Sequence, residues 1–232
     1  MKSSNAIRSE IAEIFRTKWE RRAGEDVPDS ENVKLGNDAV EIDGTVLYAD
    51  MADSTGLVSN YKDFFAAEVY KSYLKGACEI INNNGGVITA FDGDRVMAVF
   101  IGKDKNQSST KSALQINYLC REIINPAIQK QYENTAFRLE QAVGIDTGKL
   151  FVAKTGIRGA NDLVWVGRAA NNAAKLCSLR EGYYSSFITQ QVFNMLPNSS
   201  KYGGKDNKLM WDKVIWPELG IPVFRSSWQS GF

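Results

Sequence analysis

The stretches Val46-Leu47-Tyr48-Ala49-Asp50 and Phe91-Asp92-Gly93-Asp94-Arg95-Val96 decide how this chain folds. The first is an apolar run that closes on a carboxylate, and the second is a tight turn between two apolar runs. Short apolar runs are typical of buried strands, and Asp-Gly between two of them predicts a β-hairpin. Two carboxylates at the ends of neighbouring strands can hold the divalent ions that phosphoryl transfer requires. Spacing alone favours a plainer interpretation, in which Asp50 caps a helix and Asp92-Gly93 only forms the hairpin.

The segments around these stretches predict an α+β fold. Hydrophobic periodicity and turn residues predict the order strand, helix, hairpin, helix, strand, which is the ferredoxin-like split βαββαβ antiparallel sheet with both helices on one face. The expected elements are a strand at 40–50, a helix at 55–84 capped by Ser54 or Thr55, hairpin strands at 87–91 and 96–100, a helix at 109–132 and a strand at 137–147. A further strand at 162–166, a short helix at 168–179 and extra C-terminal strands complete the chain.

The N-terminal region predicts an amphipathic helix over residues 5–22. Its apolar side chains recur at helical spacing and should pack on the domain or on a second subunit: Ile7, Ile11, Ile14, Phe15 and Trp19. Residues 21–36 are polar and contain Gly24, Pro28 and Gly36, which is typical of an ordered linker. We therefore expect residues 1–36 to be a helix and linker, and residues 37–232 to be one folded domain.

Composition excludes several classes of function. The 232 residues carry 28 basic and 27 acidic side chains without a long basic stripe, so no nucleic acid partner is indicated. The longest apolar run, 96–101, is far too short to span a membrane, and we expect a cytoplasmic protein with three reduced cysteines. Histidine is absent, which excludes histidine-based triads and histidine metal sites. Any catalysis must use carboxylates, amides, Lys, Arg or a metal bound by oxygen.

Four motifs in the same order resemble the class III nucleotidyl cyclases. They are Leu47 to Thr55, Phe91 to Met97, Val143-Gly144-Ile145-Asp146-Thr147-Gly148, in which Asp146 stands where the family has histidine, and the helix Val166 to Leu176. The resemblance implies that Asp50, Asp94 and the Met51 carbonyl hold two Mg²⁺ or Mn²⁺ ions. It also implies that Ser54, Thr55 and Gly56 bind the terminal phosphates.

The same resemblance implies that the catalytic site is shared between two chains. Asn171 matches the residue that orients the ribose, and Lys175 stands where the family usually has arginine. The two lie on one helix face at i and i+4, and the less favoured alternative is that Lys175 is only a solvated surface residue. Because family members place these residues against the metal aspartates of a second chain, we expect a homodimer with two sites.

The positions that read a purine base in the family are occupied here by Ala90 and Val164, which offer no side-chain hydrogen bond. Tyr48, Arg95 and Trp165 are neighbours that could read a smaller ring, or simply pack in strands. The combination resembles the pyrimidine cyclases of bacterial Pycsar-type anti-phage defence. This resemblance implies that UTP is converted to cyclic UMP that activates a separate effector. The alternatives are cyclic CMP from CTP, an adenylyl cyclase and a non-catalytic binding module.

Overall fold

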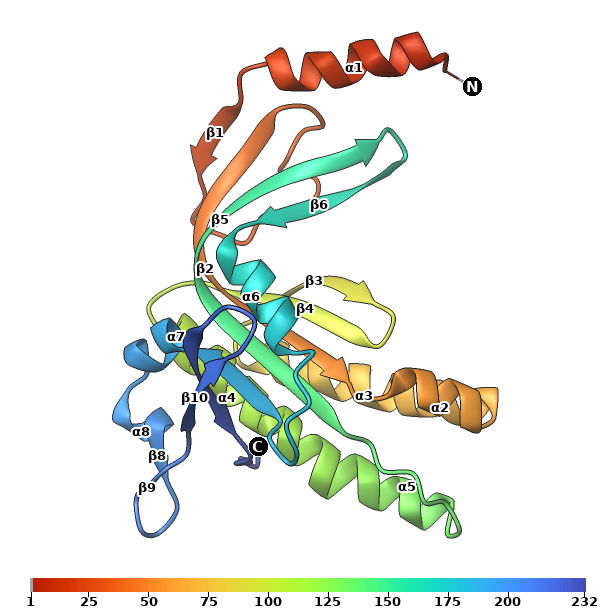
Figure 1. The fold of residues 1–232 in the computed structure, drawn as a ribbon, viewed down its shortest axis with the longest axis vertical. Helices are drawn as coiled ribbons and strands as arrows, with labels where there is room; N and C mark the ends of the chain where they lie inside the picture. Colours follow the sequence, from red (N-terminus) through yellow and green to blue (C-terminus); the bar gives the residue numbers. More distant parts are fainter. Residues whose placement is uncertain (1) are drawn as a thin grey trace. The chain divides into compact units, whose positions relative to one another are not determined.

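The computed structural model describes residues 2–232, which form two compact units. Among the described residues, the first comprises 2–43 and 149–167, and the second comprises 44–148 and 168–232. Strands β2 (Asp38–Met51) and β5 (Gln141–Ile157) each contribute to both units (Figure 1). The predicted boundary between residues 36 and 37 does not coincide with this division and stays a prediction about function.

The main sheet of the second unit has the strand order β10-β11-β7-β5-β2-β4-β3. The strands not yet placed are β3 (Val87–Asp92), β4 (Arg95–Phe100), β7 (Ser186–Thr189), β10 (Asp212–Trp216) and β11 (Ile221–Ser226). β2 pairs antiparallel with β4 in the register Asp50↔Arg95, and β4 pairs with β3 across the Asp92–Arg95 turn. The predicted hairpin and its place beside the end of β2 are therefore confirmed.

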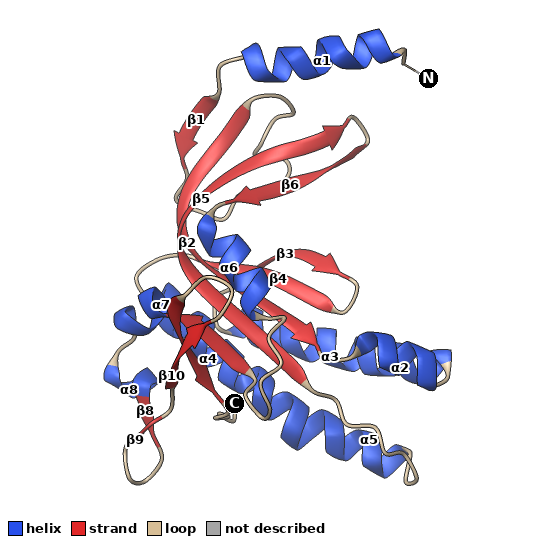
Figure 2. Ribbon diagram, in the orientation of Figure 1, coloured by secondary structure: helices blue, strands red, loops and turns tan. Residues whose placement is uncertain are grey.

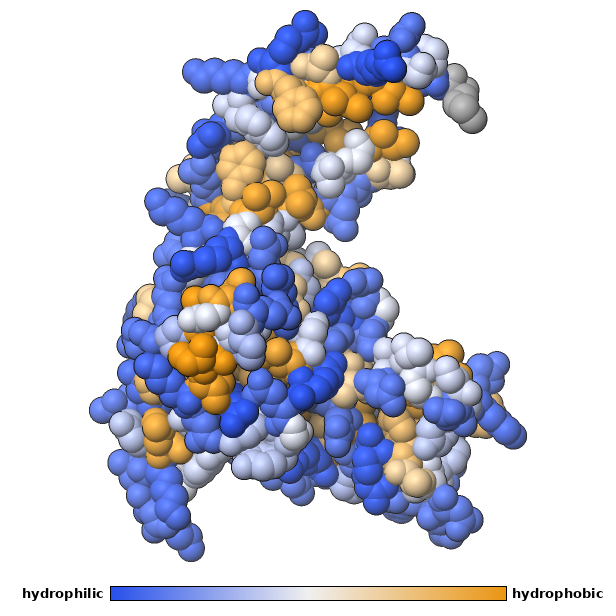
Figure 3. Space-filling view, in the orientation of Figure 1, coloured by the Kyte–Doolittle hydropathy of each residue, from blue (hydrophilic) through white to orange (hydrophobic). Residues whose placement is uncertain are grey.

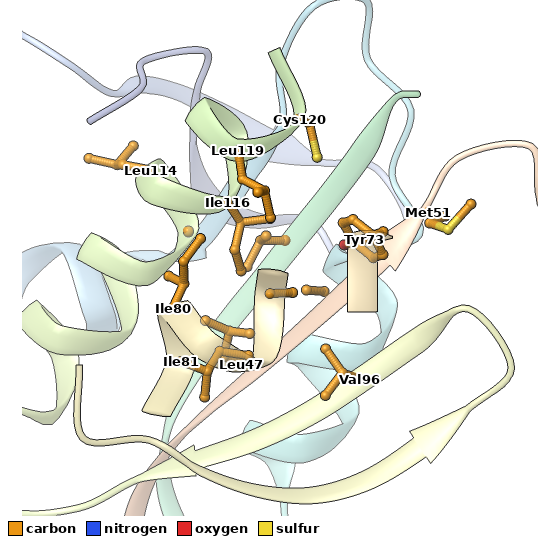
Figure 4. Close-up of a cluster of buried hydrophobic side chains, with 14 of the residues drawn as sticks. Leu47, Met51, Tyr73, Ile80, Ile81, Val96, Leu114, Ile116, Leu119 and Cys120 are labelled. Atoms are coloured by element: carbon orange, nitrogen blue, oxygen red, sulfur yellow. The ribbon is translucent and has the colours of Figure 1, made fainter. Parts of the chain in front are cut away.

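One face of this sheet is covered by long helices. They are α3 (Asp63–Asn83), α4 (Lys105–Tyr118), the π-helical turn η1 (Leu119–Ile124) and α5 (Asn125–Gln131) (Figure 2). Leu47, Ala49 and Met51 of β2 join Val143 and Ile145 of β5 in the core beneath them. Figure 4 shows Leu47 and Met51 in this core together with Ile81 of α3. Because side chains alternate along a strand, Tyr48 and Asp50 point to the opposite face.

Helix α6 (Arg168–Leu176) packs on that opposite face. Gly144 of β5 permits the contact, because a Cβ there would lie 2.2 Å from the Ala173 carbonyl oxygen and 2.4 Å from the Cys177 nitrogen. A second small core, containing Leu176 and Phe187, forms on this side. Tyr48, Asp50 and α6 therefore share one face of the sheet.

Several predicted boundaries of helices and strands differ from those in the structure. The helix expected over 55–84 is two helices, α2 (Ser54–Asn60) and α3, because Tyr61 takes an extended conformation and its ring stacks on Phe65 with centroids 5.1 Å apart. The second long helix begins at Lys105 rather than residue 109. An apolar residue near its end, Ile123, is 42% exposed, although helical spacing predicts that it points inward. The strand expected over 137–147 begins at Gln141 and continues to Ile157.

The N-terminal helix is shorter than predicted and leaves its apolar face uncovered. α1 (Ser4–Arg16) ends before Trp19, whose ring instead packs against Phe151 with centroids 4.9 Å apart. β1 (Glu20–Ala23) then pairs in parallel with β2, within the segment predicted to be a linker. Ile7, Ile11, Ile14 and Phe15 are all exposed, so the predicted packing of this stripe on its own domain is not found (Figure 3).

The remaining elements are short. They are β6 (Ala160–Val166), α7 (Gln190–Met195), α8 (Asn198–Lys201), β8 (Tyr202–Gly203) and β9 (Lys208–Leu209). Cys120 and Cys177 are buried, Cys78 is half-buried, and all three are free thiols. None of the helices within residues 2–232 has the length and apolar character needed to cross a membrane.

Candidate functional site

A cavity of about 420 Å³ opens where β2 ends beside the β3–β4 turn. Its lining residues come from the end of β2 and the start of α2, from the β3–β4 turn, and from one distant arginine. They are Asp50, Met51, Asp53, Ser54, Thr55, Asp92, Gly93, Asp94, Arg95 and Arg180. The β2–β4 register brings the Asp92–Arg95 turn to the end of β2. Asp50, Asp94 and Met51, predicted from separate motifs, thus lie around one cavity.

The carboxyl group of Asp50 is the most perturbed acid of this cavity. Burial raises its pKa, and the nearby charge of Asp94 raises it further, while the hydrogen bond and positive charge of Arg180 oppose both effects. Removing a carboxylate from water next to a second carboxylate is unfavourable unless a cation compensates. Two carboxylates and a main-chain carbonyl are also the hard oxygen donors that Mg²⁺ and Mn²⁺ prefer. The donor set therefore fits a divalent cation.

Arg180 is a residue of this cavity that the sequence did not indicate. Its Nη2 atom donates to Asp50 Oδ2 at 3.0 Å and to the Met51 carbonyl oxygen at 3.1 Å. Its Nη1 atom donates to the carbonyl oxygens of Cys177 and Leu179, which fixes the guanidinium in the loop after α6. One arginine therefore binds two of the three predicted metal ligands. No motif marks Arg180, because Asp50 and Met51 are more than a hundred residues away from it in the sequence.

The start of α2 differs from the prediction in its capping. Asp53, rather than Ser54 or Thr55, is the N-cap, in a left-handed conformation with φ of 53°. Its Oδ1 atom accepts a hydrogen bond of 3.1 Å from the Gly56 N–H. The Gly56 N–H is thus already engaged, whereas Ser54 and Thr55 line the cavity.

Asn171 and Lys175 lie on the exposed side of α6. Lys175 Nζ is 3.8 Å from Glu218 Oε2, and the side chains of both residues are more than half exposed. Within residues 2–232, neither Asn171 nor Lys175 lines the cavity at Asp50. A single chain therefore presents the two predicted halves of the site at separate places.

Asp146, which stands where the family has histidine, is a buried anchor for α6. Its carboxylate accepts hydrogen bonds from Asn172 Nδ2 at 2.9 Å, Thr189 Oγ1 at 2.5 Å and the Thr147 N–H at 2.8 Å. The side chain is 1% exposed, and its partners come from α6, β7 and β5. A buried carboxylate with three donors is well compensated. This network holds the helix that carries Asn171 and Lys175 against the sheet.

The candidate base-reading residues fall in both units. Arg95 lies 5.5 Å from the centroid of the Tyr48 ring and bonds to Asp92 Oδ2 at 2.7 Å, next to Asp50. Ala90 is on β3 in the same unit. Val164 and Trp165 belong to the other unit, where Val164 is exposed and the buried Trp165 Nε1 has no partner within residues 2–232.

Comparison with curated proteins decides the family. A uridylate cyclase from Xanthomonas perforans is 49% identical over 219 residues, covering 94% of this chain and 93% of that protein. A uridylate cyclase from Burkholderia cepacia is 45% identical and covers 99% of both chains. The chain belongs to the uridylate cyclase family. It is therefore a nucleotidyl cyclase, and the predicted enzyme class is confirmed.

Solved structures confirm the class III cyclase fold. The adenylyl cyclase CyaB from P. aeruginosa superposes with a TM-score of 0.65 at 18% identity, covering 81% of this chain and 95% of that one. The guanylyl cyclase Cya2 gives a TM-score of 0.65 at 19% identity, covering 80% and 91%. No protein-family model matches the chain. At these identities the structural likeness concerns the fold.

The Asp146 network predicts a large stability effect in the uridylate cyclase fold. Asp146→Ala leaves three buried donors without their acceptor, so we expect the free energy of unfolding to fall by about 3 kcal/mol. Urea denaturation followed by circular dichroism measures this loss. Asp162→Ala removes an exposed carboxylate on β6 and should change the free energy of unfolding by no more than about 0.5 kcal/mol. Equal effects of the two substitutions would show that Asp146 is not an anchor.

Proposed function

We propose that this chain converts UTP to 3′,5′-cyclic UMP and pyrophosphate. The observation that carries the proposal is the set of relatives named uridylate cyclase, 38–49% identical over nearly their full length. The cavity at the end of β2 supports it, because Asp50 and Asp94 meet there in a fold otherwise used by adenylyl and guanylyl cyclases. Residues 37–232 are the proposed catalytic domain.

Asp50, Asp94 and the Met51 carbonyl are the proposed ligands of two divalent ions, Mn²⁺ or Mg²⁺. When bound, such ions lower the pKa of a coordinated hydroxyl and neutralise charge on the triphosphate. The burial of Asp50 keeps its carboxylate in a low dielectric, where it interacts strongly with a cation. Ser54 and Thr55, which line the cavity at the start of α2, are the proposed ligands of the terminal phosphates. Gly56 joins them only if Asp53 releases its N–H.

Asn171 and Lys175 are the proposed catalytic residues of the opposite half-site. Asn171 orients the ribose so that its 3′-oxygen points at the α-phosphorus, and Lys175 stabilises the negative charge that develops there. Their exposure on α6 supports a site completed by a second chain, because both are accessible to a partner. A homodimer in head-to-tail arrangement then contains two identical sites.

Tyr48 and Arg95 are the proposed readers of the base. The phenol of Tyr48 can donate a hydrogen bond to a base carbonyl, and burial raises its pKa further above the ordinary value. Arg95 lies against the Tyr48 ring and lines the cavity at Asp50, where its guanidinium offers further donors. Ala90 and Val164 leave the usual purine contacts unmade, and Trp165 adds bulk beside Val164. Because these donors suit the carbonyl of either pyrimidine, CTP is the second candidate substrate.

The product is the proposed messenger of an anti-phage response in the cytoplasm, acting on a separate effector. The names of the relatives support the cyclic nucleotide, and the resemblance to Pycsar-type cyclases supports the defence role. The rival proposals are an adenylyl cyclase and a non-catalytic cyclase-like module. Retention of Asp50, Asp94 and Asn171 favours an active enzyme over the module.

Incubation of the purified protein with each of the four NTPs and Mn²⁺ tests the proposal. We expect cyclic UMP as the main product, identified by mass spectrometry, with cyclic CMP next. Asp94→Asn should lower the rate by at least about a hundredfold, because it removes a ligand charge. Asp63→Asn, at the exposed start of α3, is the matched control and should retain the wild-type rate. A purine cyclic nucleotide as main product, or no product, contradicts the proposal.

Arg180 should compete with the metal for Asp50 and Met51. We expect Arg180→Gln to tighten Mn²⁺ binding about two- to fivefold, because a partly exposed ion pair such as Arg180–Asp50 contributes only a modest free energy. Electron paramagnetic resonance of free Mn²⁺ in the absence of nucleotide measures this affinity. Arg158→Gln, an exposed arginine of the first unit, should leave it unchanged. Weaker Mn²⁺ binding in Arg180→Gln would mean that Arg180 supports the ligands instead of competing for them.

A further inference from the structure

A second cavity, of about 590 Å³, lies within the second unit between η1, the start of β5 and the loop after α6. Its volume is in the range of small-molecule sites. Its lining is rich in polar side chains, among them Asn117, Arg121, Arg138, Glu140, Gln141 and Ser185. Only Ala52 and Arg180 lie near the proposed metal ligands, and nothing in the proposed reaction uses the rest.

Two buried polar side chains of this cavity lack partners. Gln141 is 6% exposed, and neither its Oε1 nor its Nε2 atom has a hydrogen-bond partner within residues 2–232. Ser185 is also 6% exposed, and its Oγ atom is equally unpartnered in that range. Burying a polar atom without a hydrogen bond is unfavourable, so a ligand that supplies the missing bonds gains binding energy. The Gln141 amide can donate one hydrogen bond and accept another, so it suits a ligand whose hydrogen-bond donor and acceptor lie side by side.

The charged residues of the cavity favour an anion. Arg121 and Arg138 line it against the single carboxylate of Glu140. Arg180 also lines it, but its charge is already paired with Asp50. Arg121 and Arg138 donate only to main-chain carbonyl oxygens, those of Ser227 and Phe137, in the described part of the chain. Guanidinium groups without carboxylate partners are suited to phosphate, which they bind through paired hydrogen bonds.

An aromatic surface adjoins these groups. The rings of Tyr183 and Tyr184 stack with centroids 4.6 Å apart, and the Tyr183 side chain is largely exposed. A flat heterocycle can stack on such a ring. We propose that this cavity is a second ligand site, which binds a nucleoside monophosphate. Its phosphate binds Arg121 and Arg138, and the donor–acceptor edge of its base pairs with the Gln141 amide.

Isothermal titration calorimetry of the full chain in EDTA tests the site with UMP, AMP and inorganic phosphate as probes. EDTA removes the ions of the proposed catalytic site, and a monophosphate has no pyrophosphate to lose, so the assay is independent of turnover. We expect at least one of UMP and AMP to bind once per chain. Arg138→Gln should weaken binding of both that nucleotide and phosphate by about tenfold. Gln141→Leu should weaken only the nucleotide, by about tenfold.

Lys71→Gln, which removes an exposed charge from α3 outside the cavity, is the matched control and should leave all affinities unchanged. Circular dichroism shows whether the Gln141→Leu variant folds. If it does not, Arg138→Gln still tests the site, because Arg138 is exposed and its substitution should not disturb folding. The proposal is overturned if neither nucleotide binds, or if both variants bind the nucleotide as the wild type does. It is also overturned if Gln141→Leu weakens phosphate as much as the nucleotide, because the amide would then not read the base.

Discussion

The pairing of β2 with β4 is the constraint on which the rest of the site depends. Its register places Asp50 opposite Arg95, so the Asp92–Asp94 turn lies at the end of β2. A shift of one residue would turn Asp50 toward the apolar core beneath α3, where a carboxylate has no partner. Burial of Leu47, Ala49 and Met51 on that side therefore fixes Asp50 on the functional side.

The second constraint is the close contact between α6 and β5. Gly144 allows the helix to approach the strand, and Asp146 holds it there through Asn172. The helix thus presents Asn171 and Lys175 outward from a rigid support. Both halves of the proposed site are built on strands of one sheet, but they open to different places. In our account, this separation makes the dimer the catalytic unit of the uridylate cyclase.

The sequence predicted those features that depend on local patterns. Alternating apolar residues and the Asp-Gly turn predicted the strands and hairpin, and four motifs in order predicted the family. The sequence did not predict the features that depend on contacts between residues far apart in the chain. Stacking of Tyr61 on Phe65 accompanies the break between α2 and α3, and the bonds of Arg180 to Asp50 and Met51 span about a hundred and thirty residues. The role of Asp146 was hidden because a buried carboxylate needs donors that only the fold supplies.

Mixing two inactive variants tests the shared site most directly. Asp94→Asn disables the metal half and Asn171→Ala disables the other half, so each variant alone should make almost no cyclic UMP. After co-expression, a heterodimer contains one site in which both halves are intact. With random pairing, the account predicts that the mixture regains about a quarter of the wild-type rate. A mixture confirmed to contain heterodimer that stays as inactive as its parents would contradict the shared site.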